Sequence, residues 1–289
     1  MTGARVTLII VTHDSEAVIG RALDSIRYDL PVICIDNGSR DRSCEIVSRY
    51  RVNLVRNDNV GYGRACNLGA QMAETELLLF LNPDVLLEAD TVDNLLDAAT
   101  RYSNAAIFSS RIEDDLGHLQ FRERTRIEQW RASRRASRRV TPVGDCCSGF
   151  ADGSVFLVRS AAFRECGGFD PNIFLYHEDD DLSHRLHAKG YPLIHVHAAR
   201  ARHNASTSSP STAGNFIRRG RAKKASEYYI KMKYGVPASR LLDGLAQLAG
   251  ILWYGLTLNK HSMWLSLGKL MGVAGLQVNP TTGSQVKKP

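Results

Sequence analysis

The sequence predicts an α/β protein with a doubly wound, mostly parallel sheet and a helical extension at its C-terminal end. Short apolar runs alternate with helix-like segments through the first hundred residues. The strand expected at 76–81 is continuously apolar from Leu77 to Leu81, which is typical of a parallel strand covered on both faces. Polar residues follow three of these runs, where ligands bind in such sheets. They are Thr12-His13-Asp14, Asp36-Asn37 and Asn82-Pro83-Asp84.

The expected elements follow the chain in order. Apolar runs predict strands, and apolar residues at helical spacing predict helices between them. Turn residues, with Ser39 or Asp41 as cap, separate the second strand from the next helix. In the first half, strands are expected at 6–11, 31–36, 52–56 and 76–81, and helices at 15–27, from the cap to 50, and at 64–74. In the second half, strands at 153–159 and 191–197 flank a helix at 178–188.

Three segments set the expected domain organisation. Residues 117–144 lose periodicity and become rich in arginine, so a loop or a polar helix is expected there. Residues 206–211 are a Ser/Thr/Pro linker. We therefore expect a catalytic domain over 1–205, with a first half at about 1–115 and a second at about 145–205. A linker and a helical extension follow over 206–289.

The stretch 244–258 is nearly all apolar, with leucines at helical spacing. It is shorter than the roughly 20 residues that a membrane-spanning helix needs. The first expectation is a helix packed in the core, and the second is a helix lying in the plane of a membrane.

Charge and cysteine usage indicate which partners and which cellular compartment to expect for the protein. The chain has 289 residues and a net charge of +7, with eight arginines between Arg122 and Arg139 and a second basic cluster at 218–224. Such clusters are either solvated faces or surfaces that attract lipid head groups or phosphorylated substrates. The six cysteines form no C-x-x-C pair, which favours reduced thiols in a cytosolic protein. The first apolar run is too short for a signal peptide.

Clustered carboxylates mark two candidate sites. Asp84 follows a buried strand, and the four acids 178–181 open a helix. Such clusters are expected where a cation or a transferable proton balances them, so a divalent metal and a general base are predicted together. A carboxylate crowded by three others should hold a proton more readily, and Asp181 can pair with Arg185 one turn on. The alternative is that acids only complement the helix dipole.

Several of these stretches resemble the family 2 glycosyltransferases of the GT-A fold, in particular their rhamnosyltransferase-like branch. The similarity covers about 6–221 and depends on motifs in the family's order. They are 11–15 (VTHDS), 34–39 (CIDNGS), 59–69 (NVGYGRACNLG), 79–84 (LFLNPD), 167–170 (GGFD), 178–182 (EDDDL) and His203.

The resemblance implies roles by position. Asp179 matches the catalytic base, with Glu178 and Asp181 on the acceptor side. Asp84 and His203 match ligands of Mg²⁺ or Mn²⁺, oxygen-preferring ions of which the second also suits imidazole. The chain departs from the family's pattern at Asp14, where Asn is usual, and at Asn82, which replaces the first Asp of a D-x-D motif. The residues matched to nucleotide-sugar binding are Thr12, Asp14, Asp36, Asn37, Arg64, Asn67 and Asn82.

The expected activity is inverting, metal-dependent transfer of a sugar from a nucleoside diphosphate sugar. The motifs favour L-rhamnose from dTDP-rhamnose, with a UDP-sugar as the alternative. The expected acceptor is a polyprenyl-diphosphate-linked saccharide or another cell-envelope glycan. Work in the cytoplasm at the inner face of the membrane, with contact through the basic segments, is expected. No nucleic-acid partner is expected, and a homodimer is left open. The alternatives are a nucleotidyltransferase of similar α/β fold and a non-catalytic anion-binding protein.

Overall fold

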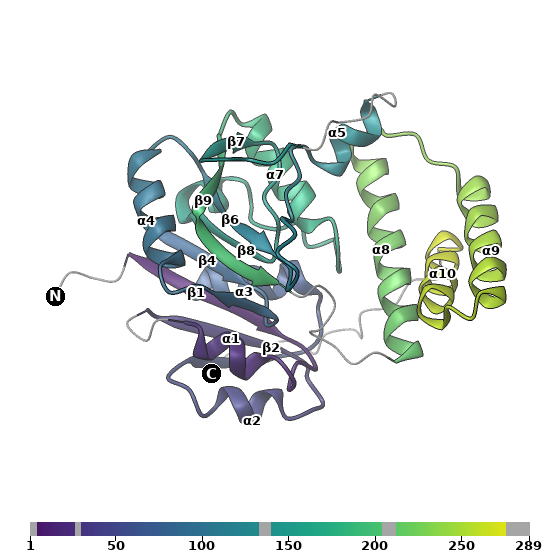
Figure 1. Ribbon diagram of the computed structural model, residues 1–289, viewed down its shortest axis with the longest axis horizontal. Coiled ribbons are helices and arrows are strands. Elements are labelled where there is room, and N and C mark those ends of the chain that lie inside the picture. Colours follow the sequence, from purple (N-terminus) through teal and green to yellow (C-terminus); the bar gives the residue numbers. More distant parts are fainter. Residues whose placement is uncertain (1–4, 27–29, 133–139, 204–211, 276–289) are drawn as a thin grey trace.

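The computed structural model describes residues 5–26, 30–132, 140–203 and 212–275. One nine-stranded sheet forms the centre of the described chain, in the order β3-β2-β1-β4-β8-β6-β9-β5, with β7 paired to β9 (Figure 1). The strands are β1 (Val6–Thr12), β2 (Val32–Asn37), β3 (Asn53–Asn57), β4 (Leu77–Leu81), β5 (Val85–Leu87), β6 (Ile107–Glu113), β7 (Cys146–Ser148), β8 (Val155–Arg159) and β9 (Leu193–His203).

The expected parallel order holds for the first half of the sheet. Strands β3, β2, β1 and β4 are all parallel to their neighbours. The second half is mixed, because β8 runs antiparallel to both β4 and β6 while β6 and β9 are parallel. The antiparallel β8 therefore begins beside the C-terminal end of β4. This places the residues just before β8 at the same sheet edge as the residues just after β4.

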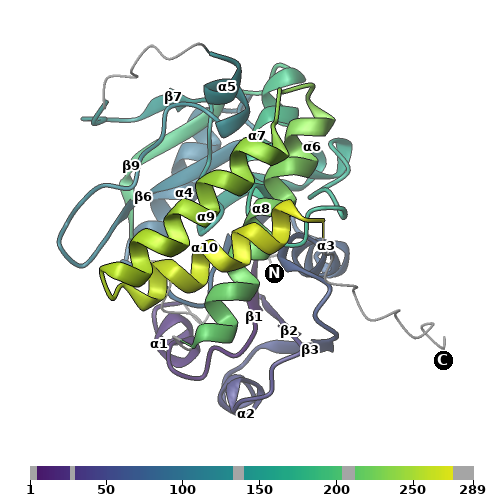
Figure 2. The same cartoon turned by 90° about the vertical axis from the view of Figure 1, so that its right-hand side faces the viewer.

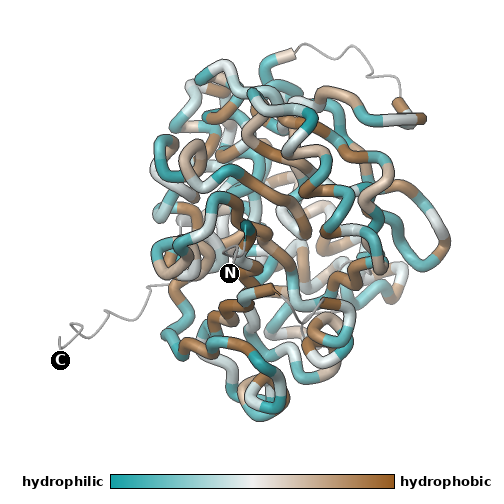
Figure 3. The backbone as a smooth tube through the Cα atoms, turned by 90° about the vertical axis from the view of Figure 1, so that its left-hand side faces the viewer, coloured by the Kyte–Doolittle hydropathy of each residue, from teal (hydrophilic) through white to brown (hydrophobic). Residues whose placement is uncertain are grey.

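Helices cover both faces of the sheet and enclose two apolar cores. Along β1, Leu8 and Ile10 face the first core, and Ile9 and Val11 face the second, as the two-residue period of a strand requires. The first core is covered by α1 (Ile19–Asp24), α2 (Ser43–Val47) and α4 (Thr91–Arg101), and the second by α3 (Tyr62–Met72), α6 (Ser160–Glu165) and α7 (Glu178–Ala188). Hydrophobic segments cross the interior, whereas hydrophilic residues gather at the turns (Figure 3).

Some helices differ in extent from the expectation. The helix expected at 15–27 is confined to α1, and α2 begins at Ser43 without a side-chain cap, although Asp41 accepts a hydrogen bond from the Ser43 N–H at 2.9 Å. In the arginine-rich segment, α5 (Arg126–Arg131) begins with a capping box between Thr125 and Glu128. Residues 133–139 and the linker at 206–211 lie outside the described part of the chain.

Three C-terminal helices form a layer beside the sheet: α8 (Ala213–Lys233), α9 (Arg240–Leu256) and α10 (Lys260–Val273). Helix α8 lies next to the sheet domain, and α9 lies outermost (Figures 1 and 2). Helices α8 and α10 approach so closely that only glycine fits at their contact. A Cβ on Gly220 would lie 2.2 Å from the Leu265 carbonyl oxygen, and one on Gly268 would lie 2.1 Å from that of Ile217.

The prediction that 244–258 packs in the core is wrong. None of the residues of α9 is buried. The residues that α9 turns toward α10 include Gly244 and Gly250, which come near Val273 and Ser266. Because glycines occupy the inner side of the helix, its leucines are left on the outer side.

Candidate active site

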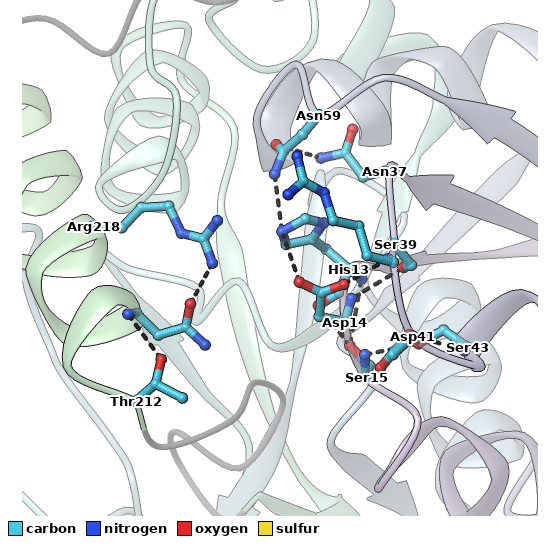
Figure 4. Close-up of polar contacts among 12 residues, drawn as sticks. His13, Asp14, Ser15, Asn37, Ser39, Asp41, Ser43, Asn59, Thr212 and Arg218 are labelled. Atoms are coloured by element: carbon cyan, nitrogen blue, oxygen red, sulfur yellow. Dashed lines mark hydrogen bonds and ion pairs between the residues drawn. The ribbon is translucent and has the colours of Figure 1, made fainter.

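The polar ends of the first three parallel strands meet at one edge of the sheet (Figure 4). Thr12 and Asp36 are register partners on β1 and β2, and both are buried. The Asn37 amide donates to Asn59 Oδ1 at 3.3 Å, and Asn59 Nδ2 lies 3.2 Å from His13 Nε2. The structure therefore brings together side chains that follow β1, β2 and β3. The sequence predicted the first two of these strand ends, but its third was the end of β4 and not Asn59.

Two carboxylates at this edge hold the turn that follows β2. Asp14 has a left-handed backbone, with φ of 50°, and its Oδ1 accepts from the Arg40 N–H at 2.8 Å. Asp36 Oδ1 accepts from the Ser39 N–H at 3.3 Å. By contrast, the buried Thr12 hydroxyl has no partner. An unpaired buried hydroxyl is uncommon in folded proteins, which makes Thr12 a candidate ligand-binding group.

Arg64 and Asn67 contact a different segment. Arg64 Nε donates to the Pro171 carbonyl at 2.6 Å. The Asn67 side chain bonds twice to the backbone of Phe169, at 2.8 and 2.9 Å. Both residues therefore hold the segment 169–171 against α3. The resemblance had matched them to nucleotide-sugar binding together with the residues at the strand ends (Thr12, Asp14, Asp36 and Asn37, the strand-end group). Their hydrogen bonds do not reach that group.

Asp84 and His203 form the candidate metal site. The two residues lie together because Val85, which directly follows Asp84, is the register partner of His203 in the pairing of β5 with β9. His203 Nε2 lies 3.4 Å from Asp84 Oδ1. Burial disfavours the charged imidazole, but the hydrogen bond and charge of Asp84 outweigh it and raise the pKa of His203. His203 Nδ1 is buried without a partner.

This pair fits a metal that is only partly coordinated by protein. Among the described residues, no group of three or more His, Cys, Asp or Glu side chains is arranged to hold an ion. A carboxylate oxygen and an imidazole nitrogen suit Mn²⁺, and the carboxylate also suits Mg²⁺. The other ligands would then come from water and from oxygens of a bound substrate.

A short segment, Asp152-Gly153-Ser154, connects the metal-site strand to the acidic helix. The Asn82 N–H donates to the Ser154 carbonyl at 2.8 Å, and the Gly153 N–H donates to Asp179 Oδ2 at 3.2 Å. The charge of Asp152 acts on both sites, because it raises the pKa of His203 and of Asp179. The two predicted acid sites therefore lie on either side of one segment, at the same edge of the sheet.

Sequence reasoning gave Asp152 no role. The available signal was an acid followed by Gly-Ser, directly before a strand. A parallel β8 would have placed Asp152 at the opposite edge of the sheet. Only the antiparallel direction of β8 brings it beside the end of β4.

The four acids of α7 point in different directions, because successive residues of a helix are about 100° apart. Glu178 is buried, lies toward Gly63 of α3, and has an unpartnered Oε2. Asp180 is 2.9 Å from Arg122 Nη2 and accepts from the Arg126 N–H at 2.7 Å. Only Asp179 and Asp180 of the four line the neighbouring cavity.

Asp181 joins α7 to α8. Its carboxylate accepts from Arg185 Nε at 2.7 Å, Lys233 Nζ at 2.6 Å and Tyr234 Oη at 2.7 Å. The predicted pairing of Asp181 with Arg185 is thus confirmed. Neither Glu178 nor Asp181 lines the cavity, whereas Asp180 does. The place of Glu178 and Asp181 on the acceptor side stays a prediction.

Asp179 has the properties of a general base. Burial raises its pKa, and the charges of Asp180 and Asp152 raise it further, whereas Arg122 opposes the shift. The prediction of a raised pKa is confirmed, although burial contributes more than the crowding of acids. A carboxylate of raised pKa accepts a proton more strongly near neutral pH.

The cavity beside Asp179 has a volume of about 520 Å³. It lies between α5, α7 and α8, and its walls combine cations with aromatic rings. Arg122 stacks on Phe150 with 3.4 Å between its Cζ and the ring centre. A pocket of this size and mixed lining suits a sugar or a similar polar ligand. Its lining includes Phe121, Arg122, Arg126, Trp130, Asp152, Tyr176, Asp179, Asp180 and Lys223.

The second basic cluster is not simply a solvated face. Lys224 is buried, and its Nζ lies 3.1 Å from Glu227 and 3.0 Å from Asp243. Lys223 makes no hydrogen bond or ion pair with any other described residue, and its Nζ lies 5.6 Å from the centre of the Tyr176 ring. Two adjacent lysines therefore differ, because one ties the helices together and the other is available at the cavity.

Solved structures with the same architecture are glycosyltransferases of the GT-A fold. The mannosyltransferase PcManGT from Pyrobaculum calidifontis, in complex with GDP-Man and Mn²⁺, matches with a TM-score of 0.57 at 15% identity over 96% of this chain and 89% of that chain. GalNAc-T7 with UDP, GalNAc and Mn²⁺ matches with a TM-score of 0.56 at 16% identity. That match covers 76% of this chain but only about half, 48%, of GalNAc-T7. The predicted fold class is confirmed.

The family follows from sequence similarity. The profile of Glycosyl transferase family 2 matches residues 7–167, more than half of the chain. The N-acetylglucosaminyl-diphospho-decaprenol L-rhamnosyltransferase of Mycobacterium tuberculosis (strain ATCC 25618 / H37Rv) is 31% identical over 231 residues, covering 68% of this chain and 75% of that protein. Rhamnosyltransferase WbbL of Escherichia coli (strain K12) is 26% identical over 220 residues, covering 69% and 83%. The chain belongs to glycosyl transferase family 2, as a rhamnosyltransferase-like member.

Family membership makes the protein a glycosyltransferase and sets aside the nucleotidyltransferase and non-catalytic alternatives. Within the described part of the chain, no helix is both long and apolar enough to cross a membrane. All six cysteines are free thiols.

Proposed function

We propose that the protein is an inverting glycosyltransferase that transfers L-rhamnose from dTDP-rhamnose to a lipid-linked saccharide, with a UDP-sugar as the alternative donor. The observation that supports it best is the connection through 152–154, which joins the Asp84–His203 pair to a carboxylate of raised pKa beside a cavity. The rhamnosyltransferase names of two relatives support the choice of sugar.

The strand-end group is the proposed donor site. Thr12 offers an unpaired buried hydroxyl, and Asp36 and Asn37 lie beside it on β2. Asp14 orders the turn next to them through Arg40. Arg218, in the first part of α8, donates to Asn215 Oδ1 and is drawn on the other side of the view from this group (Figure 4).

Asp84 and His203 would hold Mg²⁺ or Mn²⁺, with Asn82 on the same loop as Asp84. A bound divalent cation would supply positive charge that stabilises the diphosphate as it leaves the sugar. The chain's own contribution is to keep Asp84 buried and His203 half-buried next to the β4 end, where β5 and β9 align them.

Asp179 is the proposed base. Its Oδ2 is oriented by the Gly153 N–H and its Oδ1 accepts from the Asp180 N–H at 2.8 Å. An acceptor hydroxyl in the cavity would transfer its proton to this carboxylate as its oxygen attacks the sugar. One direct displacement of this kind inverts the configuration of the transferred sugar.

The cavity lining favours an acceptor sugar that carries phosphate. Trp130 and Tyr176 offer aromatic faces, and Arg126 and Lys223 offer cations at the same cavity. Arg122 is already paired with Asp180, so the charge available to a ligand comes mainly from the other two. A polyprenyl-diphosphate-linked saccharide, held at the cytoplasmic face of the membrane, satisfies this chemistry.

The test is a donor and acceptor screen scored by nucleoside diphosphate release and by the anomeric configuration of the product. N-acetylglucosamine linked to a short lipid diphosphate is compared with the same sugar on an uncharged lipid. The expected result is preference for dTDP-rhamnose, an inverted product and faster turnover of the diphosphate acceptor. A retained configuration would contradict the single displacement, and equal use of both acceptors would contradict the phosphate-binding role of Arg126 and Lys223.

A further inference from the structure

Helix α9 presents an apolar stripe to the outside of the molecule. Its leucines recur at helical spacing and are about half to four-fifths exposed, from 47% at Leu248 to 83% at Leu256. Trp253 lies next to them with 64% exposure. The whole stripe comprises Leu241, Leu242, Leu245, Leu248, Leu252, Trp253 and Leu256. Soluble helices usually bury such a stripe.

The polar side of α9 is the side that faces the protein. Asp243 accepts from Tyr228 Oη at 2.7 Å and lies 3.0 Å from Lys224 Nζ, both on α8. Gly244 and Gly250 turn toward α10. The helix is therefore held against α8 and α10 by its polar and small residues. In this position its leucines face outward. Both overall views place this helix outermost (Figures 1 and 2).

The charges at the two ends of the stripe are cationic. Arg240 begins α9, and Lys260 follows its end, and both are exposed. The only acid in α9 is Asp243, which is already paired. A second copy of the chain is poorly suited to cover this stripe, because a twofold contact between two such stripes would bring like charges together. Parallel helices would juxtapose Arg240 with Arg240, and antiparallel helices would juxtapose Arg240 with Lys260.

An anionic bilayer surface fits the same features. A helix of 17 residues extends about 25 Å, which is too short to span but long enough to lie in the plane of the interface. Leucine and tryptophan suit the boundary between head groups and acyl chains, and lysine and arginine attract anionic lipids. We propose that α9 seats the enzyme on an anionic membrane, with its leucines inserted and Arg240 and Lys260 at the lipid phosphates.

This inference goes beyond the proposed transfer and does not depend on it, since binding to a bilayer needs neither donor nor acceptor. The two ideas are connected by α8. This helix carries Lys223 at the cavity and also supports α9 and α10. A membrane contact through α9 would therefore hold the cavity at a fixed position relative to the lipid surface.

The test uses the full chain and flotation with phosphatidylcholine vesicles, prepared with and without phosphatidylglycerol. The double variant Leu245→Asp/Leu252→Asp should bind anionic vesicles at least about a hundredfold more weakly, at roughly tenfold for each leucine. The matched control is Leu116→Asp, which changes a leucine that is 80% exposed on another part of the surface. This control should bind as wild type does. The variant Arg240→Gln/Lys260→Gln should lose the preference for anionic vesicles.

A second measurement keeps the wild-type fold. Vesicles with brominated acyl chains should quench the fluorescence of Trp253, and Trp253→Phe should remove that quenching. Asp179→Asn should bind vesicles fully even where it abolishes transfer, which separates failure of this proposal from failure of the proposed function.

Several results would overturn the proposal. They include absence of vesicle binding by the wild type, and equal losses in the Leu116 control and the α9 variant. A dimer in sedimentation that the α9 variant breaks, with vesicle binding unchanged, would assign the stripe to a second copy. Vesicle binding that appears only after removal of residues 276–289 would assign the stripe to the chain's own C-terminal segment.

Discussion

Replacement of Asp179 by asparagine is the most direct test of the proposed base. The change preserves size, and the side-chain oxygen can still accept from the Asp180 N–H. The other position gains an NH₂ group that faces the Gly153 N–H, which now donates to Oδ2 at 3.2 Å. The variant thus loses the proton acceptor while the helix and the cavity keep their shape.

The expected loss is large. A positioned general base contributes about 10²- to 10⁴-fold to the rate, so kcat should fall about a thousandfold, which corresponds to about 4 kcal/mol in the activation barrier. The KM for the donor should change little, because Asp179 is not part of the strand-end group. Nucleoside diphosphate release at saturating donor and acceptor measures both constants.

The pH dependence adds a second readout. Asp179 can accept a proton only when it is ionised, so the wild-type rate falls as pH falls through its pKa. Burial and the charges of Asp180 and Asp152 raise that pKa above the ordinary value of 3.8. The acid limb of the kcat/KM profile should therefore lie closer to neutral pH than for an ordinary aspartate, and it should disappear in Asp179→Asn.

Glu178→Gln is the matched control for this experiment. Glu178 is the adjacent acid on the same helix and is buried, but it does not line the cavity, and its Oε2 has no partner. Its activity should stay within a few-fold of wild type, with the acid limb retained. If Asp179→Asn kept more than half of the wild-type kcat, or if Glu178→Gln lost as much, the assignment of the base to Asp179 would be refuted.

Three further predictions concern the metal site and the helices. Asp84→Asn and His203→Ala should each raise the Mn²⁺ concentration needed for half-maximal rate by at least about tenfold, and Mn²⁺ binding in the presence of nucleoside diphosphate, followed by electron paramagnetic resonance, should weaken in parallel. Asp181→Asn breaks buried pairs with Lys233 and Arg185 and should lower the free energy of unfolding by about 3 kcal/mol in urea titrations, with the acid limb unchanged. Gly268→Val overpacks the α8–α10 contact and should cost at least about 2 kcal/mol in the same titrations.

Sequence patterns predicted the first half of the fold well because the residues of each strand there form an apolar run that marks the strand. Continuous apolar character marks β4, and all five of its residues are buried. The polar residues that follow β1 and β2 meet at one edge because parallel strands share their direction. The bounds of α7 were also predictable, since its acids begin the helix and Gly190 ends the periodic pattern.

The topology of the second half could not be predicted as well, because the residues of a strand do not indicate whether it pairs parallel or antiparallel with its neighbours. A mostly parallel sheet was expected, and the antiparallel direction of β8 places Asp152 at the site. Side-chain partners are likewise set by elements distant in sequence. Asn67 bonds to Phe169 backbone groups rather than facing the strand ends. The apolar pattern of α9 predicted burial, but the pattern does not indicate which face of the helix packs against the rest of the chain.

In the acidic turn of α7, the partners of each acid, rather than the sequence, distinguish the carboxylate that we propose as the base. The dipole at the helix N-terminus favours all of these acids to a similar degree. Arg122 neutralises Asp180, and Lys233 and Arg185 neutralise Asp181, so these two hold α7 against its neighbours. Among the described residues, neither Asp179 nor Glu178 has a cation within ion-pair distance, and burial raises the pKa of both. Of these two acids, only Asp179 lines the cavity. Moving one of the cations to Asp179 would stabilise its ionised form and weaken it as a base.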